Sequence, residues 1–112
     1  MDSATLHDED LYLMSSVQPE DSGLPFVVYI SERQGQHDVR VKVAAGPKAP
    51  PFVASVSVRP EIEVVAGQLS ARDLNLVRQG VELNRDIIID HWEGRMPSSR
   101  AALNALRPIP KA

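Results

Sequence analysis

The fold is decided by residues 70–94, which read SARDLNLVRQGVELNRDIIIDHWEG. Ser70, followed three residues later by Asp73, is typical of the capping box at the start of a helix, with Asp in place of the usual Glu or Gln. Gly94 suits the position after a helix end, because glycine readily adopts the left-handed backbone conformation found there. This stretch therefore predicts one long helix from about Ser70 to Trp92.

The predicted helix has two apolar sides when its residues are placed at about 100° per step. The broader side, which we expect to cover a sheet, holds Leu74, Val77, Val81, Ile88, Ile89 and Trp92. About half a turn away, the helix seam is formed by Leu76, Leu83 and Ile87. Either the leader and the C-terminal helix cover this seam, or it binds a protein partner, most simply a second copy of the chain. The candidate partner-binding residues are the helix seam with Gly80 and Asn84.

Four stretches before the helix are typical of strands, because they are rich in β-branched residues or alternate apolar and polar positions. They cover residues 25–30, 39–43, 52–58 and 61–64. After the long helix, residues 97–106 predict a shorter helix that ends before Pro108. The sequence therefore predicts an α+β fold. A small antiparallel sheet of about four strands, in two hairpins, packs on one long amphipathic helix, with a short C-terminal helix.

The 112 residues suit a single domain, and their charge is unevenly distributed. Residues 1–22 carry six acidic residues and no Lys or Arg, whereas the rest of the chain has a net charge of +3. We expect residues 1–24 to form a flexible acidic leader, residues 25–109 a single domain and residues 110–112 a tail. The leader is either solvated, or it folds over a basic face where it competes with an anionic partner.

Several classes of protein are disfavoured by the composition. The chain has no cysteine, which removes disulfides, thiolate catalysis and cysteine-based zinc sites. No two histidines are four residues apart, so we predict no metal site and no cofactor. The apolar runs are far shorter than the about 20 residues of a membrane span, and the N-terminus lacks the order of a signal peptide. We therefore expect a cytoplasmic protein with no membrane partner.

Basic residues around the first hairpin are candidates for binding an anion, including the phosphates of a nucleic acid. They are Arg33, His37, Arg40, Lys42 and Lys48. The low aromatic content of 4% argues against a base-stacking surface, and the acidic total argues against nucleic-acid binding. His37, Glu32 and Arg40 could also assemble a hydrolase or nuclease site. Because any hairpin turn collects polar residues, we assign no catalytic residue.

The second half of the chain resembles a bacterial family known as domain of unknown function 4160. The similarity lies in Glu61–Leu69, Ile87–Ile89, Trp92 and Leu106–Ile109, and it extends over about residues 25–109. It implies a β-rich front half, followed by a long helix that ends in tryptophan and a short tail with a proline. The family has no established activity. Its members resemble small accessory proteins, often encoded beside another small domain in an arrangement similar to toxin–antitoxin pairs.

The chain departs from this family at the first hairpin. Family members carry the pattern acidic-His-x-Pro-Pro-His-x-His there, whereas this chain offers only Glu32 and His37, with Arg40 near the last histidine. A metal-binding or catalytic role of those histidines would therefore be lost here. Our leading hypothesis is a non-enzymatic protein-interaction module, one half of a small accessory or toxin–antitoxin-like pair. The alternatives are a nucleic-acid-binding effector and a hydrolase centred on His37.

Overall fold

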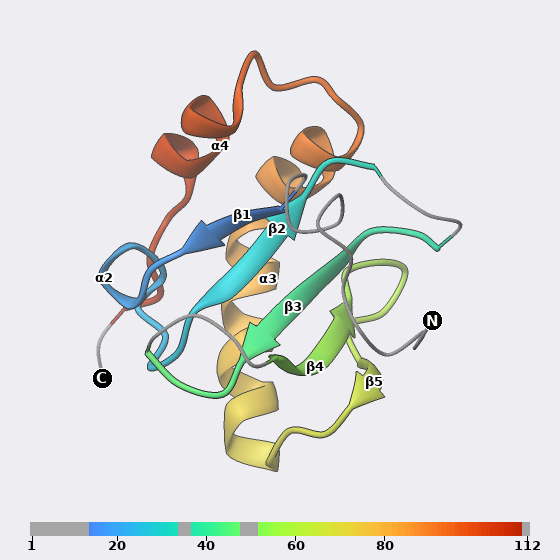
Figure 1. The fold of residues 1–112 in the computed structure, drawn as a ribbon, viewed down its shortest axis with the longest axis vertical. Coiled ribbons are helices and arrows are strands. Elements are labelled where there is room, and N and C mark those ends of the chain that lie inside the picture. The colour runs from blue at the N-terminus through green and yellow to red at the C-terminus, as the bar shows by residue number, and fades with distance from the viewer. Residues whose placement is uncertain (1–13, 34–36, 48–51, 111–112) are drawn as a thin grey trace, which may run out of the picture.

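The computed structural model describes residues 14–33, 37–47 and 52–110, and it confirms the α+β class (Figure 1). The chain order is strand β1 (Met14–Val17), helix α2 (Pro19–Ser22), strands β2 (Val28–Ser31), β3 (Arg40–Ala44), β4 (Phe52–Ser57) and β5 (Val64–Gly67), and helices α3 (Ala71–Trp92) and α4 (Ser99–Ala105). Among the helices in these ranges, none combines the length and the hydropathy that crossing a membrane requires.

The five strands form one antiparallel sheet in which every strand pairs with the next along the chain. The sheet is thus a continuous meander of five strands, whereas the sequence predicted about four strands in two hairpins. Its register pairs Val28 with Val43 and Val41 with Val56, which places these valines on one face. The alternation of valine with polar residues along β3 therefore predicted the buried face of the sheet correctly.

The expected boundary of the leader is corrected by the structure, because β1 and α2 lie within residues 1–24. β1 pairs with β2 over its whole length, from Met14 opposite Ser31 to Val17 opposite Val28. After α2, Gly23 has a φ of 78°, and a Cβ there would lie 2.6 Å from the carbonyl oxygen of Ile109. Residues 14–24 therefore belong to the packed part of the chain.

The last strand lies three residues later than expected, at Val64–Gly67 rather than at residues 61–64. The hydroxyl of Ser57 donates to the carbonyl oxygen of Glu61 at 2.6 Å, and it accepts from the backbone N–H of Glu63 at 3.1 Å. These two bonds hold the segment between β4 and β5 as a turn. Pairing of the two strands consequently resumes at Val64.

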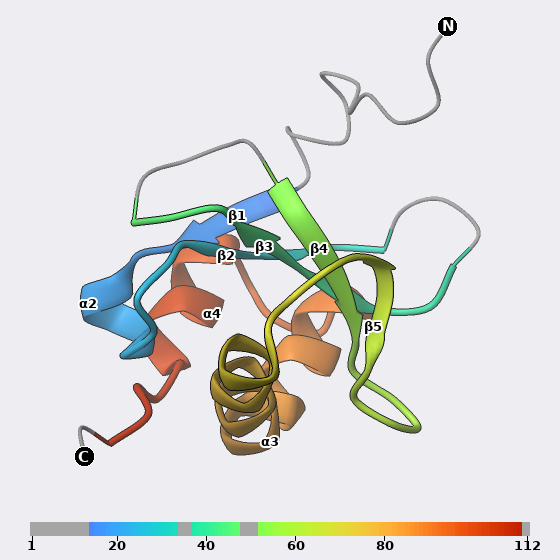
Figure 2. The ribbon, with the colours of Figure 1, turned by 90° about the horizontal axis from the view of Figure 1, so that it is seen from below.

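Helices α3 and α4 lie on the same side of the sheet, and the core fills the space between (Figure 2). The broad apolar side of α3 is confirmed as its core side. Val77, Val81, Ile88 and Trp92 are buried, and Leu74 and Ile89 pack against the same core while partly exposed. We call the opposite side of the sheet the outer face.

Helix α3 is kinked at Asn84, which has φ −120° and ψ 15° within an otherwise helical segment. The side chain of Asn84 explains the kink, because it is bonded to the chain beyond α4. Its Nδ2 donates to the carbonyl oxygen of Arg107 at 2.8 Å and to that of Gly80 at 3.0 Å. Its Oδ1 accepts from the backbone N–H of Arg107 at 2.7 Å. A tertiary contact thus interrupts the regular helix that the sequence predicts.

Candidate functional site

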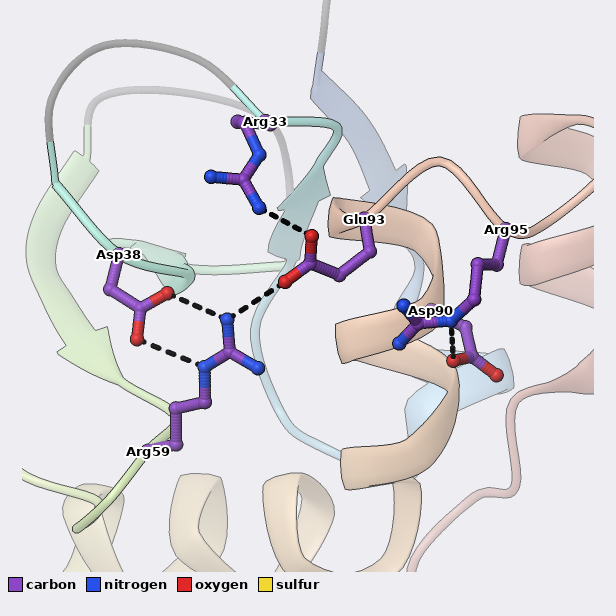
Figure 3. A network of polar contacts seen from close by, with 6 residues as sticks. All are labelled: Arg33, Asp38, Arg59, Asp90, Glu93 and Arg95. Carbon is purple, nitrogen blue, oxygen red and sulfur yellow. Dashed lines mark hydrogen bonds and ion pairs between the residues drawn. The ribbon is translucent and has the colours of Figure 1, made fainter.

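Four charged side chains meet where the β2–β3 hairpin and the end of β4 approach the C-terminal end of α3 (Figure 3). Arg59 donates from Nε and Nη2 to the two carboxylate oxygens of Asp38, each at 2.9 Å. The same Nη2 donates to Oε2 of Glu93 at 3.0 Å, and Arg33 donates to the other oxygen of Glu93. We call Arg33, Asp38, Arg59 and Glu93 the arginine–carboxylate network. Its charges alternate, so each carboxylate is held by at least one arginine.

Trp92 lies beside this network and anchors the hairpin to the helix. The ring of His37 stacks on Trp92 with centroids 5.7 Å apart and an angle of 27° between the planes. The guanidinium carbon of Arg33 lies 5.9 Å from the centre of the Trp92 ring. The backbone N–H of Arg33 also donates to the carbonyl oxygen of Trp92 at 3.0 Å. Two of the candidate anion-binding residues, Arg33 and His37, are therefore brought together at Trp92.

The arginines keep both carboxylates of the network ionised. Hydrogen bonding by Arg59 is the main cause that lowers the pKa of Asp38 from 3.8 to about 2. Hydrogen bonds from Arg59 and then from Arg33 lower the pKa of Glu93. An efficient general base has a pKa near the working pH, so these two groups are poor candidates for proton transfer at neutral pH. The chemistry of the network fits ion pairing better than hydrolysis.

The lowered pKa of Asp38 predicts how the stability of the protein changes in acid. A carboxyl whose pKa is lower in the folded state stabilises that state above its unfolded pKa, and this stabilisation is lost as the pH falls. We expect the contribution of Asp38 to disappear as the pH falls from about 4 to about 2. Urea unfolding across this range should show a smaller loss of stability in Asp38→Asn than in the parent. Glu20→Gln, an exposed control on α2, should lose as much stability in acid as the parent does. If Asp38→Asn lost as much stability as the parent over this pH range, the prediction would be contradicted.

Most of the candidate partner-binding residues on α3 contact their own chain. A Cβ at Gly80 would lie 3.8 Å from side-chain carbons of both Ile109 and Leu24. Asn84 is bonded to Arg107, whereas Leu76 and Ile87 pack partly exposed against the core. Leu83 is 38% exposed. These contacts favour the alternative in which the chain itself covers the helix seam. The homodimer stays a prediction, which light scattering can test.

The remaining candidate anion-binding residues lie on the outer face of the sheet, apart from the arginine–carboxylate network. Arg40 and Lys42 alternate along β3 with buried Val41 and Val43, so their side chains leave the sheet away from α3. The strand register aligns one row across the face, formed by Ser16, Tyr29, Lys42, Ser55 and Ala66. In this row, Nζ of Lys42 donates to the hydroxyl of Ser55 at 3.4 Å. Lys48 lies outside the described residues.

Sequence reasoning missed three members of the arginine–carboxylate network, namely Asp38, Arg59 and Glu93. Arg59 is 21 residues from Asp38 and 34 from Glu93 along the chain, and no spacing rule joins such distant positions. The same structure offers no grouping of three His, Cys, Asp or Glu residues suited to a metal ion within residues 14–33, 37–47 and 52–110. The candidate site therefore consists of the arginine–carboxylate network and, apart from it, the basic residues of β3.

Comparison with known proteins identifies the family of the chain. The family model described as Domain of unknown function (DUF4160) matches residues 26–93, which contain β2 to β5, α3 and all of the arginine–carboxylate network. No curated protein and no solved structure is significantly similar to the chain. The match covers more than half of the 112 residues and confirms the resemblance seen in the residues. The chain belongs to the DUF4160 family.

Proposed function

We propose that the chain is a non-enzymatic interaction module that binds an acidic segment of a partner protein on the outer face of its sheet. The observation that carries this proposal is that α3 and α4 lie on one side of the sheet (Figure 2). Arg40 and Lys42 alternate with buried valines along the central strand, so they extend on the other side. A second small protein, as in the toxin–antitoxin-like pairs that the family resemblance implies, is the kind of partner that this proposal needs.

The spacing of the two cations matches an extended acidic peptide. Side chains two residues apart on a strand point the same way and are separated by about 7 Å. Arg40 and Lys42 therefore present charge at the interval at which acidic residues repeat along one side of an extended segment. On β4, Ser57 is the register partner of Arg40 and Ser55 that of Lys42. Charge-assisted hydrogen bonds from such a surface to carboxylates are stronger than neutral ones.

The burial of the aromatic rings favours an acidic protein segment over a nucleic acid. Tyr29 is only 8% exposed, and its ring packs edge to face against Phe52 with ring centroids 4.9 Å apart. The ring of Tyr29 is therefore not available for stacking on a base. Arg33, the other hairpin arginine described, is engaged with Glu93. A nucleic acid is therefore the alternative that the experiment must distinguish.

Titration with a short oligoglutamate, at low salt and with backbone NMR signals as the readout, tests the proposal. We expect the largest shifts on β3 and β4. Lys42→Glu should weaken binding about tenfold, the effect of losing one charge-assisted contact. Arg100→Glu is the matched control, because it makes the same charge change at an exposed position on α4. Equal loss in both variants would contradict a specific site, and tighter binding of oligothymidylate than of oligoglutamate would favour the nucleic-acid alternative.

A further inference from the structure

We propose that the C-terminal strap, residues 106–110, occupies a peptide-binding site of this fold, and that the site also accepts the same segment from a second copy of the chain. The site is formed by Ser22 and Gly23 at the end of α2 and by Gly80 and Asn84 in α3, and we call it the strap site. The strap follows α4 directly and passes beside α2 without forming a helix or strand (Figure 1). The strap site is separate from the outer face of the sheet and does not depend on the proposed function.

The strap is bound through its backbone at two positions. Asn84 accepts at Oδ1 from the N–H of Arg107 at 2.7 Å and donates from Nδ2 to the carbonyl oxygen of Arg107 at 2.8 Å. A carboxamide has the acceptor and the donor needed to bind both groups of one residue, so it can hold an extended segment of any sequence. The carbonyl oxygen of Ser22 accepts from the N–H of Ile109 at 2.8 Å. Main-chain bonds to alternate residues are how proteins gain affinity for an extended peptide.

The side chains of the strap give the site its preference for sequence. Ile109 is 6% exposed and packs beside Gly80, where a Cβ would lie 3.8 Å from its Cγ2. A Cβ at Gly23 would lie only 2.6 Å from the carbonyl oxygen of Ile109, so a glycine there lets the strap approach closely. The guanidinium of Arg107 pairs with Asp86 at 3.3 Å. The strap site therefore suits an extended segment in which a basic residue is followed two positions later by a buried apolar one.

The surroundings of the strap favour its exchange between two copies. A cavity of about 30 Å³, with Leu24, Gly80 and Asn84 among its lining residues, remains beside the strap, so the strap is incompletely packed. Most residues of the connection between α3 and α4, 93–98, are exposed, so this connection can serve as a hinge by which α4 and the strap move together. A second copy offers the same strap with every contact unchanged, and exchange of identical elements is a low-cost route to a dimer.

Peptide binding to the full chain with Ile109→Asp tests the strap site, because this change weakens the chain's own strap. The probe is a synthetic peptide of residues 104–112, and the side-chain amide signals of Asn84 in NMR spectra report its binding. The parent strap competes at a millimolar effective concentration, so we expect Ile109→Asp to bind the probe at least tenfold more tightly than the parent chain does. Circular dichroism checks that the variant is folded, and Ile109→Ala, a milder change, replaces it if it is not.

Two altered peptides distinguish specific binding from general attraction. The peptide with Ile109→Asp should bind at least tenfold more weakly than the probe. The peptide with Pro110→Asp makes the same change of charge at a position that is exposed in the strap, and it should bind nearly as well as the probe. Equal weakening by the two changes, or a probe that leaves the Asn84 signals unmoved, would overturn the strap site.

A mixture of two full-length variants tests the exchange between copies. Ile109→Asp keeps the strap site and has a weakened strap, whereas Asn84→Asp keeps the strap and has a weakened site. We expect analytical ultracentrifugation to show a dimer in the mixture that is at least tenfold more stable than any dimer of either variant alone. A mixture that stays monomeric while Ile109→Asp binds the probe peptide would overturn the second copy as the source of the segment.

Discussion

Replacing Trp92 with alanine is expected to lower the free energy of unfolding by about 3–5 kcal/mol, the usual effect of truncating a buried aromatic side chain. Trp92 is 1% exposed and is among the largest fully buried side chains described. Domains of this size are stable by only about 5–15 kcal/mol, so a large share of the total would be lost. Urea unfolding followed by circular dichroism measures the change. Fluorescence is unsuitable because the variant removes the single tryptophan of the chain.

Two variants control for this effect. Trp92→Phe keeps an aromatic ring in the core and facing His37, and we expect it to lose clearly less stability than Trp92→Ala. Leu83→Ala removes an apolar side chain that is partly exposed on the same helix, and it should change stability by much less. Equal losses in Trp92→Ala and Leu83→Ala would contradict the role of Trp92 as the central core residue.

Asn84→Asp is expected to cost about 2–4 kcal/mol, although the two side chains have nearly the same shape. The amide of Asn84 donates to the carbonyl oxygens of Gly80 and Arg107 and accepts from the backbone N–H of Arg107. A carboxylate accepts that one bond but donates neither of the other two, so it would face two carbonyl oxygens. Because Asn84 is buried, water does not readily replace the lost bonds.

The matched control for this change is Asn75→Asp, which alters the same chemistry at an exposed position on α3. We expect its free energy of unfolding to stay close to that of the parent. Hydrogen exchange adds a second measurement, because Asn84→Asp should speed exchange of the Arg107 amide before other amides of the fold. A variant with parental stability and unchanged exchange would show that the bonds to Arg107 contribute little.

The long helix was predictable because its signals are local. Ser70 accepts from the backbone N–H of Asp73 at 3.0 Å, as the capping box requires. The apolar period of the helix identified the side that faces the core. The kink at Asn84 was not predictable, because it depends on Arg107, which is 23 residues away along the chain.

The strands were predicted less well where their residues lack a strong apolar pattern. β1 was missed because it contains two serines and follows an acidic segment, although pairing with β2 stabilises it. β5 was displaced because the bonds of Ser57 to Glu61 and Glu63 keep those residues in a turn. In both cases the deciding contacts are tertiary or involve side chains.

The candidate site was predictable only in part. Arg33 and His37 were singled out as polar hairpin residues, and the structure brings both to Trp92. Their ion-pair partners were not visible, because Arg59 and Glu93 come from other elements. The family resemblance came from the residue pattern of Glu61–Leu69, Ile87–Ile89, Trp92 and Leu106–Ile109, although the contacts of these residues could not be inferred from that pattern.

The meander order has a consequence for synthesis of the chain on the ribosome. Every strand pairs with its sequence neighbour, so formation of the sheet requires the closure of short loops only. The sheet can therefore form early in folding. Its apolar face, with Val41, Val43 and Val56, stays exposed to solvent until α3 has left the exit tunnel, because that helix follows all five strands. Nascent chains of this protein should consequently engage holding chaperones in the interval between translation of Gly67 and emergence of Trp92.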